Sequence, residues 1–139
     1  MMRQRHRTIR LETGPRQALE LTPEIRDWLD QIEAEEGLLS LFIRHTSASL
    51  TIMENADPDV MRDLTDFLAR LAPEKAGYAH DTEGPDDMPA HLKTALTQTH
   101  LSIPVIGGRL GLGTWQGIWL LEHRAMAHQR SVILHFIGE

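Results

Sequence analysis

The chain has 139 residues, 41% of them apolar, which is enough to build the core of one domain of ordinary size. Its net charge of −6 argues against general nucleic-acid binding, and the absence of cysteine excludes disulfides and thiolate metal sites. No stretch approaches ~18 consecutive apolar residues and the start lacks the apolar core of a signal peptide, so we expect a cytoplasmic protein with no membrane partner.

The first third of the chain predicts a strand, a helix and two further strands. The first strand covers residues 6–12, and its basic side chains discourage edge-to-edge pairing. Thr22 is the expected N-cap of a helix that has Pro23 at its first position. Two strands then cover residues 38–44 and 49–53. The apolar stripe of the helix consists of Ile25, Trp28, Leu29 and Ile32.

The middle of the chain predicts a second helix, an acidic loop and a short third helix. Asp57 caps the second helix, which ends before Pro73. Residues 77–89 are polar and acidic and predict a loop, and residues 89–99 predict the short helix. The second helix should bury Val60, Leu64, Phe67, Leu68 and Leu71, and the third should bury Leu92, Ala95 and Leu96.

The last third is rich in strand patterns. Strands are predicted at residues 101–106, 109–114, 116–123 and 131–137, with a hairpin turn at 107–108. The element order shows no regular βαβ alternation. We therefore predict residues 1–139 to be a single compact α+β domain with a largely antiparallel β-sheet, two longer helices and one short helix.

Eight histidines is a high count for this length, and His45, His80 and His91 stand out as metal-ligand candidates. Neutral imidazole is the commonest metal ligand, and three imidazoles would leave one coordination position open. Their spacing in the sequence does not show that they share a site, because only the tertiary fold could bring the three histidines together. In the alternative interpretation, each caps a loop or satisfies a buried hydrogen bond.

Acidic and hydroxyl residues offer further polar groups. Glu54 precedes a helix start, where acid–base residues are often displayed, whereas capping explains Asp57 better than a catalytic role does. The loop acids form a solvated face or orient an imidazole through its second nitrogen. No Gly-x-Ser-x-Gly elbow is present, so the hydroxyls beside His45 favour contacts with phosphate oxygens over nucleophilic attack. These hydroxyl residues are Thr46, Ser47, Ser49 and Thr51.

The glycine-rich segment 107–113 does not match a phosphate-binding loop, because no Gly-Lys-Ser/Thr leads from it into a helix. A hairpin explains it better. Trp115 and Gln116 follow, and a ring and an amide in that position can line a ligand pocket. Packing of the ring in a β core is the alternative.

Three blocks of sequence together resemble the YjbQ-like family, in the expected order and over nearly the whole chain. The Gly-Thr-Trp-Gln segment at residues 113–116 is the most specific part of the resemblance. The blocks are His45-Thr-Ser-Ala-Ser-Leu-Thr-Ile with Glu54-Asn55-Ala-Asp57-Pro; Tyr78-Ala-His80 through His91; and Ile103-Pro-Val, Gly108-Arg-Leu-Gly-Leu-Gly-Thr-Trp115-Gln116-Gly-Ile and Glu122-His123-Arg124.

The resemblance implies a compact α+β fold assembled as a homotrimer and a weak thiamine-phosphate-synthase-like activity, after which the family is called secondary thiamine-phosphate synthase. That reaction joins a pyrimidine methyl pyrophosphate to a thiazole phosphate and releases pyrophosphate. The resemblance also implies a divalent metal ion on His45, His80 and His91. We expect zinc in the purified protein, with magnesium as an option for the transferase reaction.

Further roles follow from the same expectation. Glu54, Asp57 and Gln116 are the predicted catalytic residues. Arginines would neutralise the departing pyrophosphate, and Trp115 would stack on the heterocycle. Two other functions stay open: a metal-dependent hydrolase of a small ester, amide or phosphate with Glu54 as base, and a non-catalytic trimer that binds a small anion. The predicted substrate-binding residues are Thr46, Ser47, Ser49, Asn55, Arg109, Trp115, Arg124 and Arg130.

Overall fold

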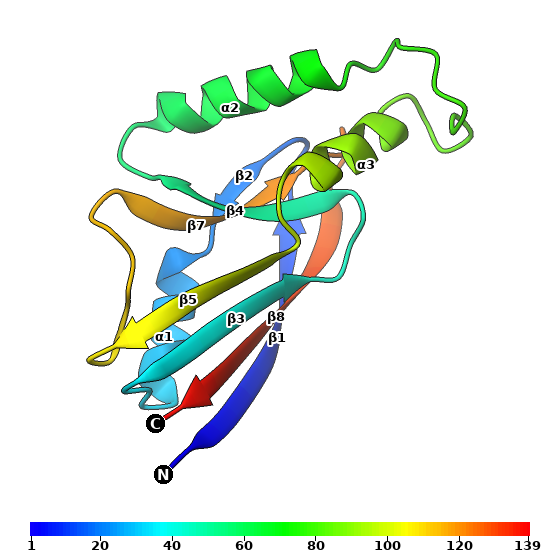
Figure 1. Cartoon of the computed structure of the whole chain (residues 1–139). Coiled ribbons are helices and arrows are strands. Elements are labelled where there is room, and N and C mark those ends of the chain that lie inside the picture. Colours follow the sequence, from blue (N-terminus) through cyan, green and yellow to red (C-terminus); the bar gives the residue numbers. More distant parts are fainter.

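The computed structural model describes residues 1–139 as eight strands and three helices (Figure 1). None of the helices is long and apolar enough to cross a bilayer. The strands are β1 (Arg3–Thr13), β2 (Ala18–Glu20), β3 (Gly37–Ile43), β4 (Ala48–Glu54), β5 (His100–Ile106), β6 (Arg109–Leu110), β7 (Gln116–Glu122) and β8 (His128–Gly138). The helices are α1 (Thr22–Gln31), α2 (Pro58–Leu71) and α3 (Asp87–Leu96).

The strands form two antiparallel sheets, which confirms the predicted α+β class. One sheet has five strands in the order β1-β8-β3-β5-β6, and the other has three in the order β2-β7-β4. The core lies where the inner faces of both sheets meet α1, and it contains 20 buried apolar residues. Strand alternation is regular in β8, where Val132, Leu134 and Phe136 all point into this core.

Helix α1 buries Ile25, Trp28 and Leu29, as the sequence pattern predicts, but its predicted cap is wrong. Thr22 is the first helical residue, and no side chain caps the helix. Its hydroxyl instead accepts a hydrogen bond from the Ile118 amide at 2.8 Å, so it fastens the helix start to β7. The capping prediction for α2 is confirmed, because the Asp57 carboxylate accepts from the Asp59 amide.

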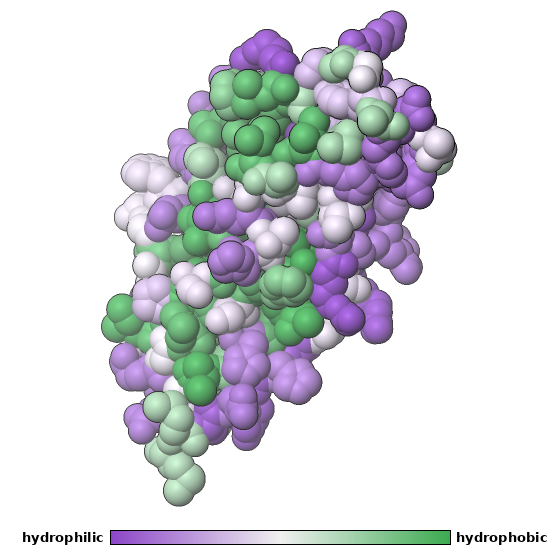
Figure 2. Space-filling model, turned by 45° about the vertical axis from the view of Figure 1, so that its right-hand side comes forward, coloured by the Kyte–Doolittle hydropathy of each residue, from purple (hydrophilic) through white to green (hydrophobic).

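Helix α2 lies over the outer face of the three-stranded sheet (Figure 1), and its predicted core stripe is only partly buried. Met61 and Leu68 are buried, whereas Phe67 and Leu71 are 48% and 54% exposed. Figure 2 shows apolar side chains gathered near the top of the molecule, at the level of α2 and α3. Only Met61 and Leu68 of α2 are buried, so the apolar stripe is wider than the face that the helix buries.

Helix α3 begins at Asp87, two residues before the predicted start, and has 10 residues, as many as α1. Its predicted buried face is wrong, because Ala95 and Leu96 are exposed. The face toward the sheet is partly polar and includes Lys93 and Thr94, so a search for apolar periodicity misplaced it.

Two strand predictions also need correction. The short strand β2 was not predicted, and the strand expected at 109–114 is only the two-residue β6. Residues beyond β6 leave the sheet, because the Gly113 amide donates to the Gln116 side chain and the Gln116 amide donates back to the Gly113 carbonyl. These bonds form a turn that leads into β7.

Candidate metal centre

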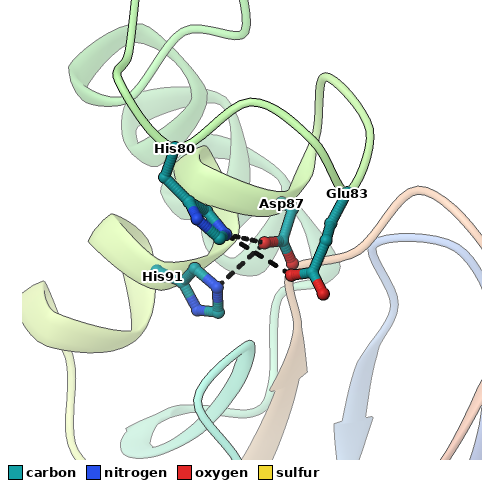
Figure 3. A group of neighbouring side chains, drawn as sticks. All are labelled: His80, Glu83, Asp87 and His91. Carbon is teal, nitrogen blue, oxygen red and sulfur yellow. Dashed lines mark hydrogen bonds and ion pairs between the residues drawn. The ribbon is translucent and has the colours of Figure 1, made fainter.

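Four potential metal ligands converge beside the start of α3 (Figure 3). Their ligand atoms all lie within 4.8 Å of one another. His80 and Glu83 come from the loop before the helix, and Asp87 and His91 stand four residues apart on one face of α3. We call this group, His80, Glu83, Asp87 and His91, the metal cluster.

Asp87 lies at the centre of the metal cluster. Its Oδ2 atom is 2.7 Å from His80 Nε2 and 3.0 Å from His91 Nε2, and Glu83 is 3.4 Å from His80 Nε2. His91 Nδ1 is 2.7 Å from the Thr46 carbonyl, which can only accept, so Nδ1 carries the proton. Because the Asp87 oxygen can only accept, its contact with Nε2 at 3.0 Å requires either a second proton on the ring or a cation between the two atoms.

Arg124 fixes the carboxylates from behind. Its Nη1 atom donates to Asp87 Oδ1 at 2.9 Å and its Nε atom to Asp86 Oδ2 at 2.9 Å. A third contact reaches the Glu83 carbonyl at 3.2 Å. Because Arg124 occupies Oδ1, Asp87 presents Oδ2 to the two imidazoles. The structure therefore places Arg124 as a positioning residue of the metal cluster.

The local charges shift several pKa values. Burial alone would raise the pKa of Asp87, but the hydrogen bond with His80 and the charges of His91 and Arg124 outweigh it, so its pKa is lowered. Burial also opposes ionisation of Asp86, yet Arg124 and the Ala125 amide lower its pKa to about 2. The Asp87 carboxylate raises the pKa of His80. Both aspartates are therefore anionic at neutral pH.

The donor set fits a divalent metal ion. Zinc takes imidazole and carboxylate ligands at about 2.0–2.2 Å, which places tetrahedral ligands roughly 3.3 Å apart. The His80–Glu83 separation of 3.4 Å matches this value, and an ion would move Asp87 Oδ2 outward from its 2.7 and 3.0 Å contacts with the two imidazoles. The side chains of His80 and Glu83 are 46% and 64% exposed, so solvent or a substrate can reach the cluster.

His45 lies outside the metal cluster. Its Nε2 atom accepts from the Ser131 amide at 2.8 Å, and the Arg130 guanidinium is 3.4 Å from its Nδ1 atom. A backbone amide can only donate, so the one lone pair of the neutral ring is already used. Burial and the charge of Arg130 lower the pKa of His45. The ring therefore fastens the end of β3 to β8.

Behind the metal cluster lies a buried polar network. Arg130 and Glu122 form an ion pair with side chains 4% and 0% exposed, and Arg130 also donates to the carbonyl and hydroxyl of Ser47. Ser49 is fully buried, and its hydroxyl is 2.8 Å from His123 Nε2. The structure thus places the predicted substrate contacts Ser47, Ser49 and Arg130 inside the fold, where the bonds from Arg130 to Ser47 position the loop at 44–47.

Five predicted site residues lie at the other end of the three-stranded sheet. Strand β4 pairs with β7 from Ala48↔Glu122 to Glu54↔Gln116, so these ends stand roughly 20 Å apart at ~3.3 Å per residue. The Glu54 carboxylate accepts from two backbone amides, and the Trp115 side chain is 63% exposed. This group consists of Glu54, Asn55, Asp57, Trp115 and Gln116. Arg109 lies elsewhere, in an open groove with Arg26 and Asp30.

Sequence reasoning assigned no metal-ligand role to Glu83 and Asp87. The signal for Asp87 is its spacing of four residues from His91 on one helix, and it was hidden because the helix was predicted to start at Pro89. Glu83 reaches the cluster through a loop, for which no spacing rule exists. Lys93 and His123 were also missed, because their burial depends on α2 and α3 folding over the sheet.

The chain is similar to known proteins over almost its whole length. The profile of the family described as "UPF0047 protein YjbQ-like" matches residues 7–139. The YjbQ protein of Salmonella typhimurium is 48% identical over 134 residues, covering 96% of this chain and 97% of that protein. A UPF0047 protein of Synechocystis is 62% identical over 104 residues, which is 74% of this chain and 71% of the relative.

Solved structures agree with this match. A protein from Clostridium acetobutylicum aligns with a TM-score of 0.86 at 34% identity, covering 93% of this chain and 98% of that one. A protein of unknown function from Sulfolobus solfataricus shares the fold alone, with a TM-score of 0.92 at 21% identity over the full length of both chains. The chain therefore belongs to the YjbQ-like UPF0047 family.

Proposed function

We propose that the chain is a metal-dependent enzyme that acts on a small phosphorylated molecule. The single observation that carries this proposal is the convergence of four ligand atoms within 4.8 Å at an accessible site. The residues that would hold the ion are His80, Glu83, Asp87 and His91, with zinc as the expected ion after purification and magnesium as an option in the reaction. A bound divalent ion would neutralise negative charge on a departing pyrophosphate.

An open groove of about 460 Å³ beside the metal cluster supports phosphate binding. Thr46 connects the two, because it lines the groove and its carbonyl contacts His91. Arg44 and Thr46 are exposed there and can donate hydrogen bonds to phosphate oxygens. Arg130 lies at the buried side of the same groove, where its charge is paired with Glu122.

The reaction we propose is the transfer implied by the family resemblance, in which a pyrimidine methyl pyrophosphate joins a thiazole phosphate and pyrophosphate leaves. Arg44 and Thr46 would bind a substrate phosphate, and Arg124 would keep Asp87 oriented. The predicted roles of Trp115 and Gln116 require a second copy of the chain to bring them to the groove, because within one chain they lie at the far end of β4 and β7.

A homotrimer in the cytoplasm is part of the proposal. The outer face of the five-stranded sheet supports self-association, since it exposes several large apolar side chains. These are Leu38, Phe42 and Ile137, which are 40%, 50% and 43% exposed. Light scattering on the purified protein should give a mass three times the chain mass of 15.8 kDa.

The test is to incubate metal-loaded protein with both substrates and to measure the joined product by mass spectrometry and released pyrophosphate by a coupled assay. We expect Asp87→Asn to lose metal and product together. Asp81→Asn is the matched control, because Asp81 is exposed in the same loop and lies outside the metal cluster. Full turnover by Asp87→Asn would contradict the proposal.

The accessibility of the metal cluster to solvent favours a metal-dependent hydrolase as the second candidate. Small phosphate esters supplied in the same assay distinguish the two, because hydrolysis releases inorganic phosphate without a joined product. Glu54 lies far from the cluster, so it cannot be the base of such a hydrolase within one chain. Saturable binding without any product would instead favour the anion-binding trimer.

A further inference from the structure

A second polar pocket lies between α2, α3 and the outer face of the three-stranded sheet. Lys93 reaches it from α3, two residues after His91 and therefore about 200° around the helix from the metal cluster. Arg16 and Gln17 line it from the turn before β2, and His123 lines it from the end of β7. Leu68 and Leu121 complete the wall.

The Lys93 ammonium has no partner in the chain. The residue is 6% exposed, and no hydrogen bond or ion pair involves its Nζ atom. Every fully buried side-chain nitrogen and oxygen in the structure has a partner, so Nζ must open into the pocket it lines. A desolvated cation without a counter-charge is costly, and an anion in the pocket would remove this cost.

The carboxylates around Lys93 are already engaged by arginines. Glu74 pairs with Arg16, and Asp86 pairs with Arg124. Glu122 lines the pocket, but its two oxygens already accept hydrogen bonds from Arg130, Thr13 and the Arg124 amide. His123 is hydrogen-bonded to Ser49 and adds no negative charge. No carboxylate at the pocket is therefore hydrogen-bonded to Lys93.

Arg16 supplies a second cation at the pocket. Its backbone φ is +48°, a left-handed conformation that is uncommon for a residue other than glycine. Its amide donates to the Arg124 carbonyl at 2.9 Å, and its guanidinium forms a surface ion pair with Glu74. The ion pair leaves the Arg16 side chain 44% exposed at the rim of the pocket, where its remaining N–H groups can donate to a ligand.

The free space in the pocket is about 10 Å³, which admits roughly one water-sized atom. We infer that this pocket binds one anionic oxygen of a small phosphate or carboxylate, with Lys93 as its buried partner and Arg16 contacting the same group at the surface. The rest of the ligand would extend outward past Arg16 and Glu74. The inference is independent of metal binding, since none of its residues belongs to the metal cluster.

The test is a titration of the ¹⁵N-labelled protein with inorganic phosphate and, separately, acetate, followed through the backbone amides of Gln17 and His123. We expect saturable shifts at both amides with at least one of the two anions, and the tighter anion identifies the group. Lys93→Met should abolish these shifts. Arg16→Gln should weaken binding by about tenfold or more, as expected for the loss of one charge-assisted hydrogen bond.

Two controls separate this site from the groove and the metal cluster. His80→Ala should keep the shifts at Gln17 and His123, whereas the amides of Arg44 and Thr46 report any phosphate in the groove. Arg16→Gln provides the test if Lys93→Met fails to fold, since Arg16 is exposed. Shifts that persist in the variants, that chloride reproduces at equal ionic strength, or that do not appear with either anion would overturn the inference.

Discussion

The two ends of the three-stranded sheet carry similar polar residues in very different surroundings. Where β4 begins and β7 ends, Ser49, Glu122 and His123 are at most 5% exposed, and each is hydrogen-bonded to another side chain. At the opposite end, Glu54 and Asp57 are accessible and accept hydrogen bonds from nearby backbone amides. We call these the buried end and the open end.

The difference shows what burial adds to a polar residue. Burying an ion pair is costly unless every polar atom finds a partner, and a satisfied network then fixes its neighbours rigidly. At the buried end, Arg130 holds Ser47, and the adjacent Thr46 carbonyl contacts His91 of the metal cluster. At the open end, Glu54 and Asp57 hold their own turn and the start of α2. The buried end is therefore the part of the sheet that can position a reactive site.

The largest effect should follow from breaking the buried ion pair. Arg130→Met leaves Glu122 charged and unpaired inside the fold, which should lower the free energy of unfolding by about 3–5 kcal/mol. Glu54→Gln at the open end keeps an acceptor oxygen and should change the free energy of unfolding by less than about 1 kcal/mol. Urea denaturation of both variants measures the difference. Equal, small losses would remove the distinction between the two ends.

The buried end should also make stability depend on pH. Burial lowers the pKa of His123 to about 4 from 6.5. Between these values the unfolded chain binds a proton that the folded chain does not, so stability is present above pH 6.5 and falls as the pH approaches 4. The loss should be about 3 kcal/mol, scaled from the shift.

His123→Leu isolates this contribution when its urea denaturation is compared with that of wild type at pH 7 and pH 4.5. The comparison is needed because Asp87 raises the pKa of His80. That shift stabilises the folded state at low pH and therefore opposes the effect of His123. The variant should lose less stability than wild type on acidification. Identical stability profiles against pH for the variant and wild type would contradict the contribution assigned to His123.

A smaller effect is expected from Arg124, which acts on the metal through Asp87. Arg124→Gln should weaken metal binding by about 10–100-fold, as is usual when the partner of a ligand is lost. Competition with a chromogenic chelator measures this affinity. Arg62→Gln is the matched control, since Arg62 pairs only with Asp59 on the surface of α2. An unchanged metal affinity in Arg124→Gln would show that Asp87 does not need Arg124 to position it for metal binding.

The smallest effect is expected at the open end. Asp57→Ala removes the cap of α2 and should lower the free energy of unfolding by about 1 kcal/mol. Metal content should stay unchanged, because Asp57 contributes no ligand to the metal cluster. Thermal unfolding and metal analysis of the same sample test both statements. Loss of metal in this variant would show that the open end affects the metal cluster, and would contradict the distinction between the two ends.

Much of the fold was predictable from local patterns. Strand patterns located β3, β5 and β8, alternation located β4, and the Asp57-Pro58 signal located the start of α2. The start of α3 was missed because Asp87 and Met88 belong to a segment that reads as acidic loop, and propensity carries no information about the groups that surround Asp87. The buried face of α3 was missed because Lys93 and Thr94 face the sheet.

The candidate site was predictable in part. His80 and His91 were identified by residue type and by the family resemblance, and the structure brings them together with Asp87. His45 was grouped with them because it ends an apolar strand, yet its ring nitrogens face the Ser131 amide and Arg130. No spacing rule reveals such a competing hydrogen bond, since its donor lies 86 residues further along the chain.

Metal content per chain tests the central claim most directly. It should be measured by mass spectrometry on protein purified without a histidine tag, for wild type, His91→Ala and His45→Ala. The account predicts near-stoichiometric metal in wild type and in His45→Ala, and loss of metal in His91→Ala. Folded wild type without metal, or metal that His45→Ala loses and His91→Ala retains, would contradict it.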